Sequence, residues 1–193
     1  EPNVRQPVIG FVGHIRPNQG VELMLKAVAQ IHAERPQVSA LIIGDGPLMD
    51  AMRLLADEVG LNGAVEFTGL ITERQDWEQR LAGCLLGVAP YEPDPASLTY
   101  YADPTKPKDY LGLGLPVLIT DVPEIAGRIE DAGAGTIVEY EQESLVRGIE
   151  RYLDDPALLE ESRKSAIELA SRFSWDSIFS RAIEESWARA EGT

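Results

Sequence analysis

The stretch that most directly indicates the fold is Asp103-Pro104-Thr105-Lys106-Pro107-Lys108-Asp109-Tyr110-Leu111-Gly112-Leu113-Gly114-Leu115-Pro116-Val117. Its first part predicts a short helix that carries two lysines and a carboxylate on its first turns. Its second part predicts a Gly-Leu-Pro turn and then a buried strand over residues 117–120. A helix that leads into an apolar strand is the repeating unit of a parallel sheet.

The rest of the chain repeats this alternation. Further buried strands are predicted at residues 8–13, 38–44, 65–68, 85–89 and 135–139. Helices are predicted at about 20–34, 47–59, 73–81 and 124–129, and from about 143 onward, with a long loop over 90–101. Strands rich in Val, Ile and Leu that alternate with helices form a parallel sheet covered on both faces. We therefore expect one Rossmann-like α/β domain over residues 1–193, with about six strands and additional C-terminal helices.

The charge of the chain limits its partners. Seventeen Lys and Arg stand against 32 Asp and Glu, which gives a net charge of −15. Such an acidic surface argues against binding to nucleic acid or to an anionic membrane. An anionic ligand would need a local basic pocket, for which the candidates are His14, Arg16, Lys106 and Lys108.

The cysteine and histidine content is low. The single cysteine, Cys84, lies in an apolar run and is expected to be a core thiol, and the absence of any possible intrachain disulfide favours a cytoplasmic location. Two histidines and one cysteine cannot form a closed zinc site alone. Because no apolar run approaches the length of a membrane span, we expect neither a membrane-spanning segment nor a signal peptide. Because the chain opens with Glu1-Pro2-Asn3, we expect it to be part of a longer protein.

The start of the lysine helix is a candidate ligand site. The N-terminus of a helix attracts anions, so Thr105 and Lys106 can bind one there, while Asp109 lies one turn further on the same face. The alternative is an ion pair between Lys106 and Asp109 on a solvated helix. Ligands of such sheets bind beyond the carboxyl ends of the strands. That edge holds residues 13–20, 69–72, 90–101 and 105–109.

Other nucleotide chemistries find little support in the sequence. The turn after the first strand lacks the Gly-x-Gly-x-x-Gly spacing of dinucleotide-binding domains, and there is no phosphate-binding loop of the Gly-x-x-x-x-Gly-Lys type. Asp45 could imitate a ribose-binding acid, but the sequence Gly44-Asp45-Gly46-Pro47 is more typical of a turn that opens a helix.

Four correctly spaced stretches resemble a known family. They are Gly10-Phe11-Val12-Gly13 with Gly20-Val21-Glu22-Leu23-Met24-Leu25-Lys26-Ala27; Leu41-Ile42-Ile43-Gly44-Asp45-Gly46-Pro47; Val65-Glu66-Phe67-Thr68-Gly69; and Pro104-Thr105-Lys106 through Pro116-Val117. Over nearly its whole length the chain resembles the C-terminal, donor-binding half of a family-four (group one) retaining glycosyltransferase of the GT-B fold.

The resemblance implies a function and a site. The ligand would be a nucleoside-diphosphate sugar, held without a metal ion or other cofactor. Lys106 would be catalytic and neutralise the leaving diphosphate, Asp109 would contact the ribose, and Gly13 would let the backbone approach the phosphates. The full donor-binding set implied is Gly13, His14, Arg16, Gln19, Ile71, Tyr91, Thr105, Lys106 and Asp109.

The chain departs from the family pattern at three positions. His14 and Gln19 stand where the family commonly has Arg and Lys on the diphosphate, and Tyr101 stands where the first Glu of a two-glutamate motif is expected. The acid of the long loop could instead be Glu92, Asp94 or Asp103, and the sequence does not choose among them.

The last segment predicts a partner domain. Trp175, Phe179 and Trp187 recur at helical spacing in residues 174–193. In the GT-B fold such a helix returns to an N-terminal, acceptor-binding domain, so we expect this chain alone to transfer no sugar. Two other functions stay open: a non-catalytic nucleotide-sugar-binding or regulatory domain, and a dinucleotide-binding oxidoreductase domain.

Overall fold

The structure is a computed structural model, and it describes residues 7–173. Six parallel strands form one sheet in the order β3-β2-β1-β4-β5-β6. They are β1 (Val8–Val12), β2 (Ser39–Ile43), β3 (Val65–Gly69), β4 (Leu86–Ala89), β5 (Val117–Thr120) and β6 (Gly135–Val138). The predicted six-stranded, Rossmann-like parallel sheet is confirmed. The strand order reverses between β1 and β4, which is where ligands of such sheets bind.

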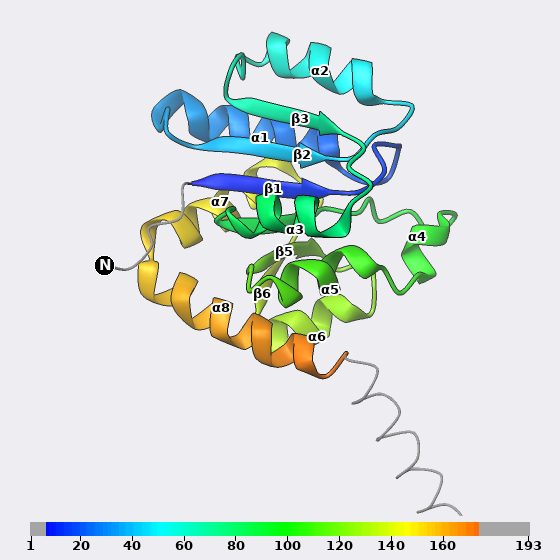
Figure 1. The fold of residues 1–193 in the computed structure, drawn as a ribbon, viewed down its shortest axis with the longest axis vertical. Helices are drawn as coiled ribbons and strands as arrows, with labels where there is room; N and C mark the ends of the chain where they lie inside the picture. Colours follow the sequence, from blue (N-terminus) through cyan, green and yellow to red (C-terminus); the bar gives the residue numbers. More distant parts are fainter. Residues whose placement is uncertain (1–6, 174–193) are drawn as a thin grey trace, which may run out of the picture.

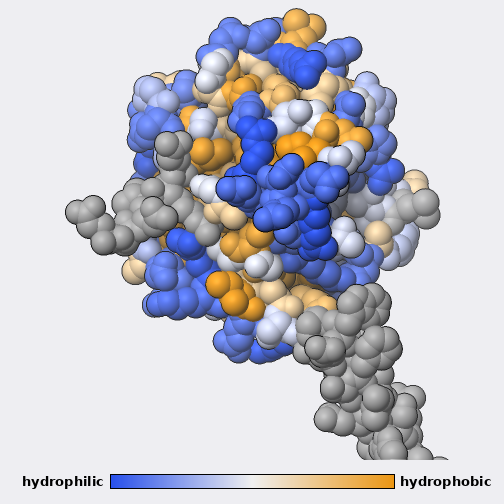
Figure 2. All heavy atoms as spheres, in the orientation of Figure 1, coloured by the Kyte–Doolittle hydropathy of each residue, from blue (hydrophilic) through white to orange (hydrophobic). Residues whose placement is uncertain are grey.

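Helices cover both faces of the sheet (Figure 1). Residues of α1 (Val21–Glu34), α2 (Met49–Glu58) and α7 (Gln142–Asp154) form one apolar cluster with one face. The other face packs against α3 (Arg74–Ala82), α5 (Thr105–Gly112), α6 (Ile125–Asp131) and α8 (Pro156–Ser171). Figure 2 shows the α3 side, where mostly hydrophilic residues lie over the middle and apolar patches lie around them. Because the two layers bury alternate residues of each strand, the strands read as continuous apolar runs.

The structure differs from the sequence-based expectation in detail. Residues 90–101, predicted to be a loop, include the short helix α4 (Leu98–Tyr101), and Ser97 Oγ accepts a hydrogen bond from Thr99 N at its start. The helix predicted from Pro47 begins at Met49, because Met49 N first bonds Gly46 O in a turn. Cys84 is buried, as predicted. The predicted helix over 174–193 lies outside the described residues.

No helix among residues 7–173 combines the length and the apolar character needed to cross a bilayer.

One side chain joins the two strands at the reversal point. The pairing of β1 with β4 ends at Gly10 and Gly87, and beyond it the hydroxyl of Tyr110 takes the place of the missing backbone bonds. Tyr110 Oη accepts a hydrogen bond from Val12 N at 3.0 Å and donates one to Val88 O at 3.1 Å. Because Tyr110 is fully buried, these two bonds are made in a site that excludes water.

The ring of Tyr110 requires a glycine beneath it. A Cβ atom on Gly87 would lie 2.4 Å from the ring, so only glycine lets α5 approach the sheet this closely. Tyr110 and Lys106 lie one turn apart on α5. The contact of Tyr110 with β1 and β4 therefore also fixes where the lysine side chain leaves the helix.

We expect Tyr110→Phe to lower the free energy of unfolding by about 1–3 kcal/mol, because it leaves the half-buried N–H of Val12 and the buried carbonyl of Val88 without their partner. Denaturant titration measures the loss. Tyr152→Phe is the matched control, since within the described part of the chain the Tyr152 hydroxyl bonds the rotatable hydroxyl of Thr136 and no backbone group. A smaller loss for Tyr110→Phe than for the control would contradict the role given to Tyr110.

Candidate functional site

Lys106 is buried at the start of α5, although it is a lysine. Only 8% of the residue is exposed, and its Nζ donates a hydrogen bond to Gln19 Oε1 at 3.0 Å. Nζ lies 3.9 Å from the ring centroid of Phe11 and 4.9 Å from that of Tyr91. We call these four neighbours (Phe11, Gly13, Gln19 and Tyr91) the Lys106 enclosure. The predicted donor-binding residues Gly13, Gln19, Tyr91 and Lys106 are thus brought together.

The enclosure disfavours the charged form of the amine. Burial, and then the nearby guanidinium of Arg16, lower the pKa of Lys106 from its ordinary 10.5 to about 7. The two aromatic rings favour a cation by about 0.5–2 kcal/mol, which offsets only part of the burial effect. Among the described residues no carboxylate lies within 4.0 Å of Nζ. A buried amine without an anionic partner can bind an incoming anion.

Gly13 follows the first strand and forms one wall of the enclosure. Its φ of 145° lies in a region that side-chain-bearing residues rarely adopt, and a Cβ atom there would lie 3.1 Å from Lys106 Cε. A larger residue would therefore strain the backbone and press on the lysine. The glycine keeps open the approach to the amine along the backbone.

Asp109 does not pair with Lys106. Its Oδ1 lies 3.6 Å from Arg74 Nη2 at the start of α3, and burial raises the pKa of this carboxyl while Arg74 opposes the rise. Arg74 Nε also donates to Glu78 Oε1 at 2.6 Å. The alternative of a Lys106–Asp109 ion pair on a solvated helix is therefore wrong, because Lys106 is buried and Asp109 has another partner.

A cavity of about 340 Å³ adjoins the Lys106 enclosure at Gly13. Its walls are largely apolar and come from the ends of β1, β2 and β3 and from α3: Val12, Gly13, His14, Ile43, Gly44, Asp45, Leu70, Ile71 and Trp77. The predicted residues His14 and Ile71 lie here. Asp45 Oδ1 accepts a hydrogen bond from Gly46 N at 2.7 Å, which is the turn role expected for it.

Two residues of this region were not predicted from the sequence. Arg74 lies with its guanidinium 5.9 Å from the Trp77 ring centroid, beside the cavity that Trp77 lines. The one available signal is Trp77 itself, a large aromatic residue in the polar first half of a helix that begins five residues after a strand ends.

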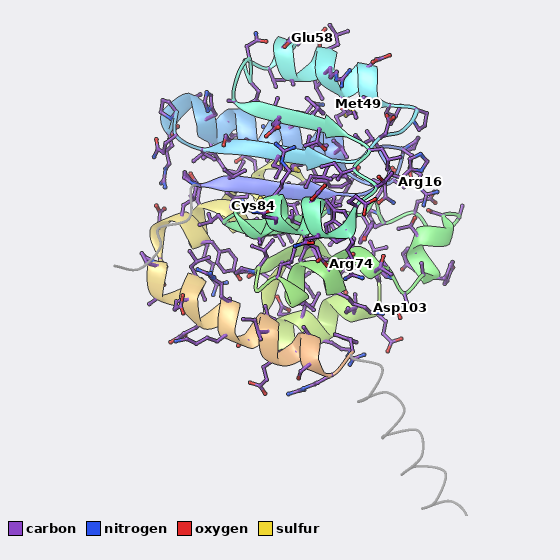
Figure 3. All side chains as sticks on the ribbon, in the orientation of Figure 1. Arg16, Met49, Glu58, Arg74, Cys84 and Asp103 are labelled. Atoms are coloured by element: carbon purple, nitrogen blue, oxygen red, sulfur yellow. The ribbon has the colours of Figure 1, made fainter. Side chains whose placement is uncertain are left out.

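The two remaining basic candidates, Arg16 and Lys108, differ in their surroundings. Arg16 is exposed and lines a second cavity, of about 270 Å³, together with Glu92. Lys108 pairs with Asp103 at 2.5 Å and lies 5.3 Å from the Phe173 ring centroid, so the prediction that it joins the same basic pocket is wrong. Figure 3 shows Arg16 and Asp103 near the carboxyl ends of the strands.

The residues of the long loop and the helix start have varied surroundings. Thr105 is exposed at the first position of α5. Tyr101 is 74% exposed, and its ring meets that of Tyr100 edge-on. Asp94 accepts a hydrogen bond from Ala96 N, and Asp103 pairs with Lys108. Within residues 7–173 no group of three or more His, Cys, Asp or Glu side chains could hold a metal ion.

Solved structures share this architecture. A complex of a mutant of TarM from S. aureus with Fondaparinux, alpha-GlcNAc-glycerol and UDP matches 93% of this chain and 35% of its own, with a TM-score of 0.76 and 17% identity. The C-terminal domain of the glycosyl transferase group 1 family protein LpcC from Francisella tularensis matches 86% of this chain and 85% of its own, with a TM-score of 0.69 and 20% identity. The predicted fold, one half of a GT-B glycosyltransferase, is confirmed.

Sequence comparison agrees with the fold. A GDP-mannose-dependent monoacylated alpha-(1-6)-phosphatidylinositol monomannoside mannosyltransferase of Corynebacterium glutamicum is 30% identical over 176 residues, which cover 86% of this chain and 42% of that protein. This chain thus spans less than half the length of that relative. The sequence model of the family described as "Glycosyl transferases group 1" matches residues 1–172. This match argues against the alternative function as a dinucleotide-binding oxidoreductase domain. The chain belongs to the glycosyl transferases group 1 family.

Proposed function

We propose that this chain binds the nucleoside-diphosphate sugar donor of a retaining glycosyltransferase that requires no metal ion. The observation that carries the proposal is the burial of Lys106 where the strand order reverses, with no carboxylate partner within residues 7–173. A diphosphate supplies the anion that the enclosure lacks. The positive end of α5 favours the same charge.

The chemistry of the proposed site follows from where negative charge develops. As the bond from the sugar to the diphosphate breaks, charge accumulates on the leaving phosphate oxygens. A hydrogen-bond donor held rigidly beside those oxygens stabilises the transition state more than the ground state. Lys106 is that donor and therefore the catalytic residue of the proposal. Arg16, close enough to affect the amine, adds a second positive charge at the mouth of the site.

The remaining predicted residues place the rest of the donor. The nucleoside would occupy the apolar cavity lined by His14 and Ile71, and Thr105 would bind the phosphates at the start of α5. Asp109 would accept a hydrogen bond from a ribose hydroxyl once it leaves Arg74. A solved structure of similar fold contains UDP, and one relative is named GDP-mannose-dependent, so uracil and guanine are both candidate bases.

Transfer itself would need more than this chain. An acceptor hydroxyl must be placed against the sugar carbon, and such positioning supplies much of the rate of a two-substrate reaction. We propose that an N-terminal domain of a longer, cytoplasmic protein binds the acceptor and contacts residues 174–193. This chain alone would then bind donor and transfer no sugar.

A non-catalytic, donor-binding domain is the second candidate. It is favoured by the uncharged Gln19 in the enclosure and by the solvent-exposed Tyr101. Full-length protein that binds a nucleotide sugar, yet neither transfers it to an added acceptor nor hydrolyses it, would support this reading over the transferase.

We expect Lys106→Met to weaken binding of UDP or GDP by about 1.5–3 kcal/mol, the contribution of a hydrogen bond to a charged group. Calorimetric titration near pH 6.5 measures the change. Lys164→Met, which removes an exposed lysine of α8, is the matched control and should bind as the unmodified chain does. Unchanged affinity in Lys106→Met would remove Lys106 from the site.

The same variant should stabilise the ligand-free chain. In the unfolded chain Lys106 keeps a pKa near 10.5 and binds a proton, whereas in the folded chain it loses that proton above about pH 7. The stability of the unmodified chain therefore rises with pH between these values. Lys106→Met should raise the free energy of unfolding by about 1 kcal/mol or more at neutral pH, with a gain that shrinks toward pH 10. Denaturant titration at several pH values tests this, and a destabilised variant would contradict it.

We expect Asp109→Asn to weaken binding of UDP or GDP by about 0.5–1.5 kcal/mol, because the amide replaces a charged acceptor of the ribose hydroxyl. The matching 2′,3′-dideoxynucleotide, which offers no such hydroxyl, should lose little affinity. Equal losses for both nucleotides in calorimetry would contradict the ribose contact.

A further inference from the structure

We propose that Gln19 is a positioning residue that holds Lys106 Nζ in the empty site without supplying an opposing charge, and that the donor diphosphate draws a proton onto Lys106 as it binds. This inference rests on the proposed function and adds two things to it: a role for Gln19, and a proton that enters with the donor.

The hydrogen bond between the two residues gives Gln19 this role. Gln19 is only 6% exposed and lies at the end of the loop between β1 and α1, 87 positions before Lys106 in the sequence. Its amide oxygen accepts from Nζ but carries no charge. A neutral amine can still donate this bond, so the contact positions Nζ without requiring the charged form.

The groups that face Nζ from each neighbouring element make the charged form unfavourable. The loop after β1 contributes the Arg16 cation as well as Gln19, β1 contributes the Phe11 ring, and the residues after β4 contribute Tyr91. Burial raises the pKa of Tyr91, which therefore stays a neutral phenol.

The nearby carboxylates are engaged elsewhere. On the same helix Asp109 is paired with Arg74, and Asp103, just before that helix, is paired with Lys108. An incoming diphosphate is therefore the anion that can favour a proton on Nζ. The balance of the step is simple: a proton passes from solvent to the lone pair of Nζ. The resulting ammonium donates to a phosphate oxygen and can keep its bond to Gln19.

This arrangement makes donor binding depend on pH. Free Lys106 has a pKa of about 7, and a bound diphosphate raises it. Donor affinity should then be nearly constant below about pH 6 and fall by up to tenfold per pH unit above about pH 7. Proton uptake should be close to one per donor near pH 8 and small near pH 6.

Calorimetry measures the proton directly. UDP-glucose and GDP-mannose are suitable probes, because a diphosphate esterified at both ends does not titrate in this range. Titrations near pH 6 and pH 8, each in two buffers of different ionisation enthalpy, give the number of protons taken up. Uptake that rises from pH 6 to pH 8 is the expected result. Binding without proton uptake at pH 8 would overturn the inference and leave the proposed function standing. No binding of either probe would overturn both.

A pair of matched variants tests Gln19. Gln19→Glu places a carboxylate on Nζ, which should charge the amine before the donor arrives, remove most of the proton uptake at pH 8 and weaken binding by about tenfold or more. Gln37→Glu makes the same charge change at an exposed position between α1 and β2, at the opposite edge of the sheet, and should leave uptake and affinity unchanged. Unchanged uptake in Gln19→Glu would overturn the role of Gln19.

NMR of the ligand-free protein provides a second readout that does not require binding. The chain has four lysines (Lys26, Lys106, Lys108 and Lys164), so ¹³Cε labelling gives few signals to assign. One signal should titrate near pH 7, disappear in Lys106→Met and titrate at a much higher pH in Gln19→Glu. If all four signals titrate near their ordinary pKa, the inference is wrong even if the donor binds.

Discussion

The hydroxyl of Tyr110 is the contact on which the geometry of the site depends. It completes the hydrogen bonding of β1 and β4 just where their own pairing ends. A parallel sheet must open at the point where its strand order reverses, and an unsatisfied buried backbone group there would be destabilising. Because the Tyr110 hydroxyl makes these hydrogen bonds, Tyr110 fixes the distance of α5 from the sheet and its rotation about its own axis. The lysine one turn earlier is thereby directed along Gly13 instead of into solvent.

The same geometry explains why a destabilising residue is kept in the core. An amine that is enclosed by two aromatic rings, faced by a guanidinium and hydrogen-bonded to a neutral amide is poorly solvated. The buried amine makes the folded state less stable. An anion that reaches it, however, is attracted strongly, because little water is present to screen the two charges. Such local destabilisation is common where a protein must bind a charged group. The rest of the chain is strongly acidic and repels anions, so the Lys106 enclosure is a local site that favours an anionic ligand.

Local patterns in the sequence predicted the alternation of strands and helices, the buried Cys84 and the turn role of Asp45, because each depends on residues close in the chain. The spacing of the motifs predicted that the chain is one half of a GT-B fold and that Lys106 lies in its ligand site. The partners of the charged groups could not be predicted this way. Gln19 meets Lys106 because the sheet order places the end of β1 beside β4, and Arg74 meets Asp109 because α3 and α5 pack on the same face of the sheet. Helix α4 was missed since a four-residue helix shows no periodicity.

A crystal structure of this chain with UDP or GDP bound tests the central claim most directly. The account predicts a phosphate oxygen within about 3 Å of Lys106 Nζ, beside Gly13, with the nucleoside in the cavity lined by Ile71 and Trp77. A nucleotide bound elsewhere, while Lys106 stays on Gln19 and meets no phosphate, would contradict it.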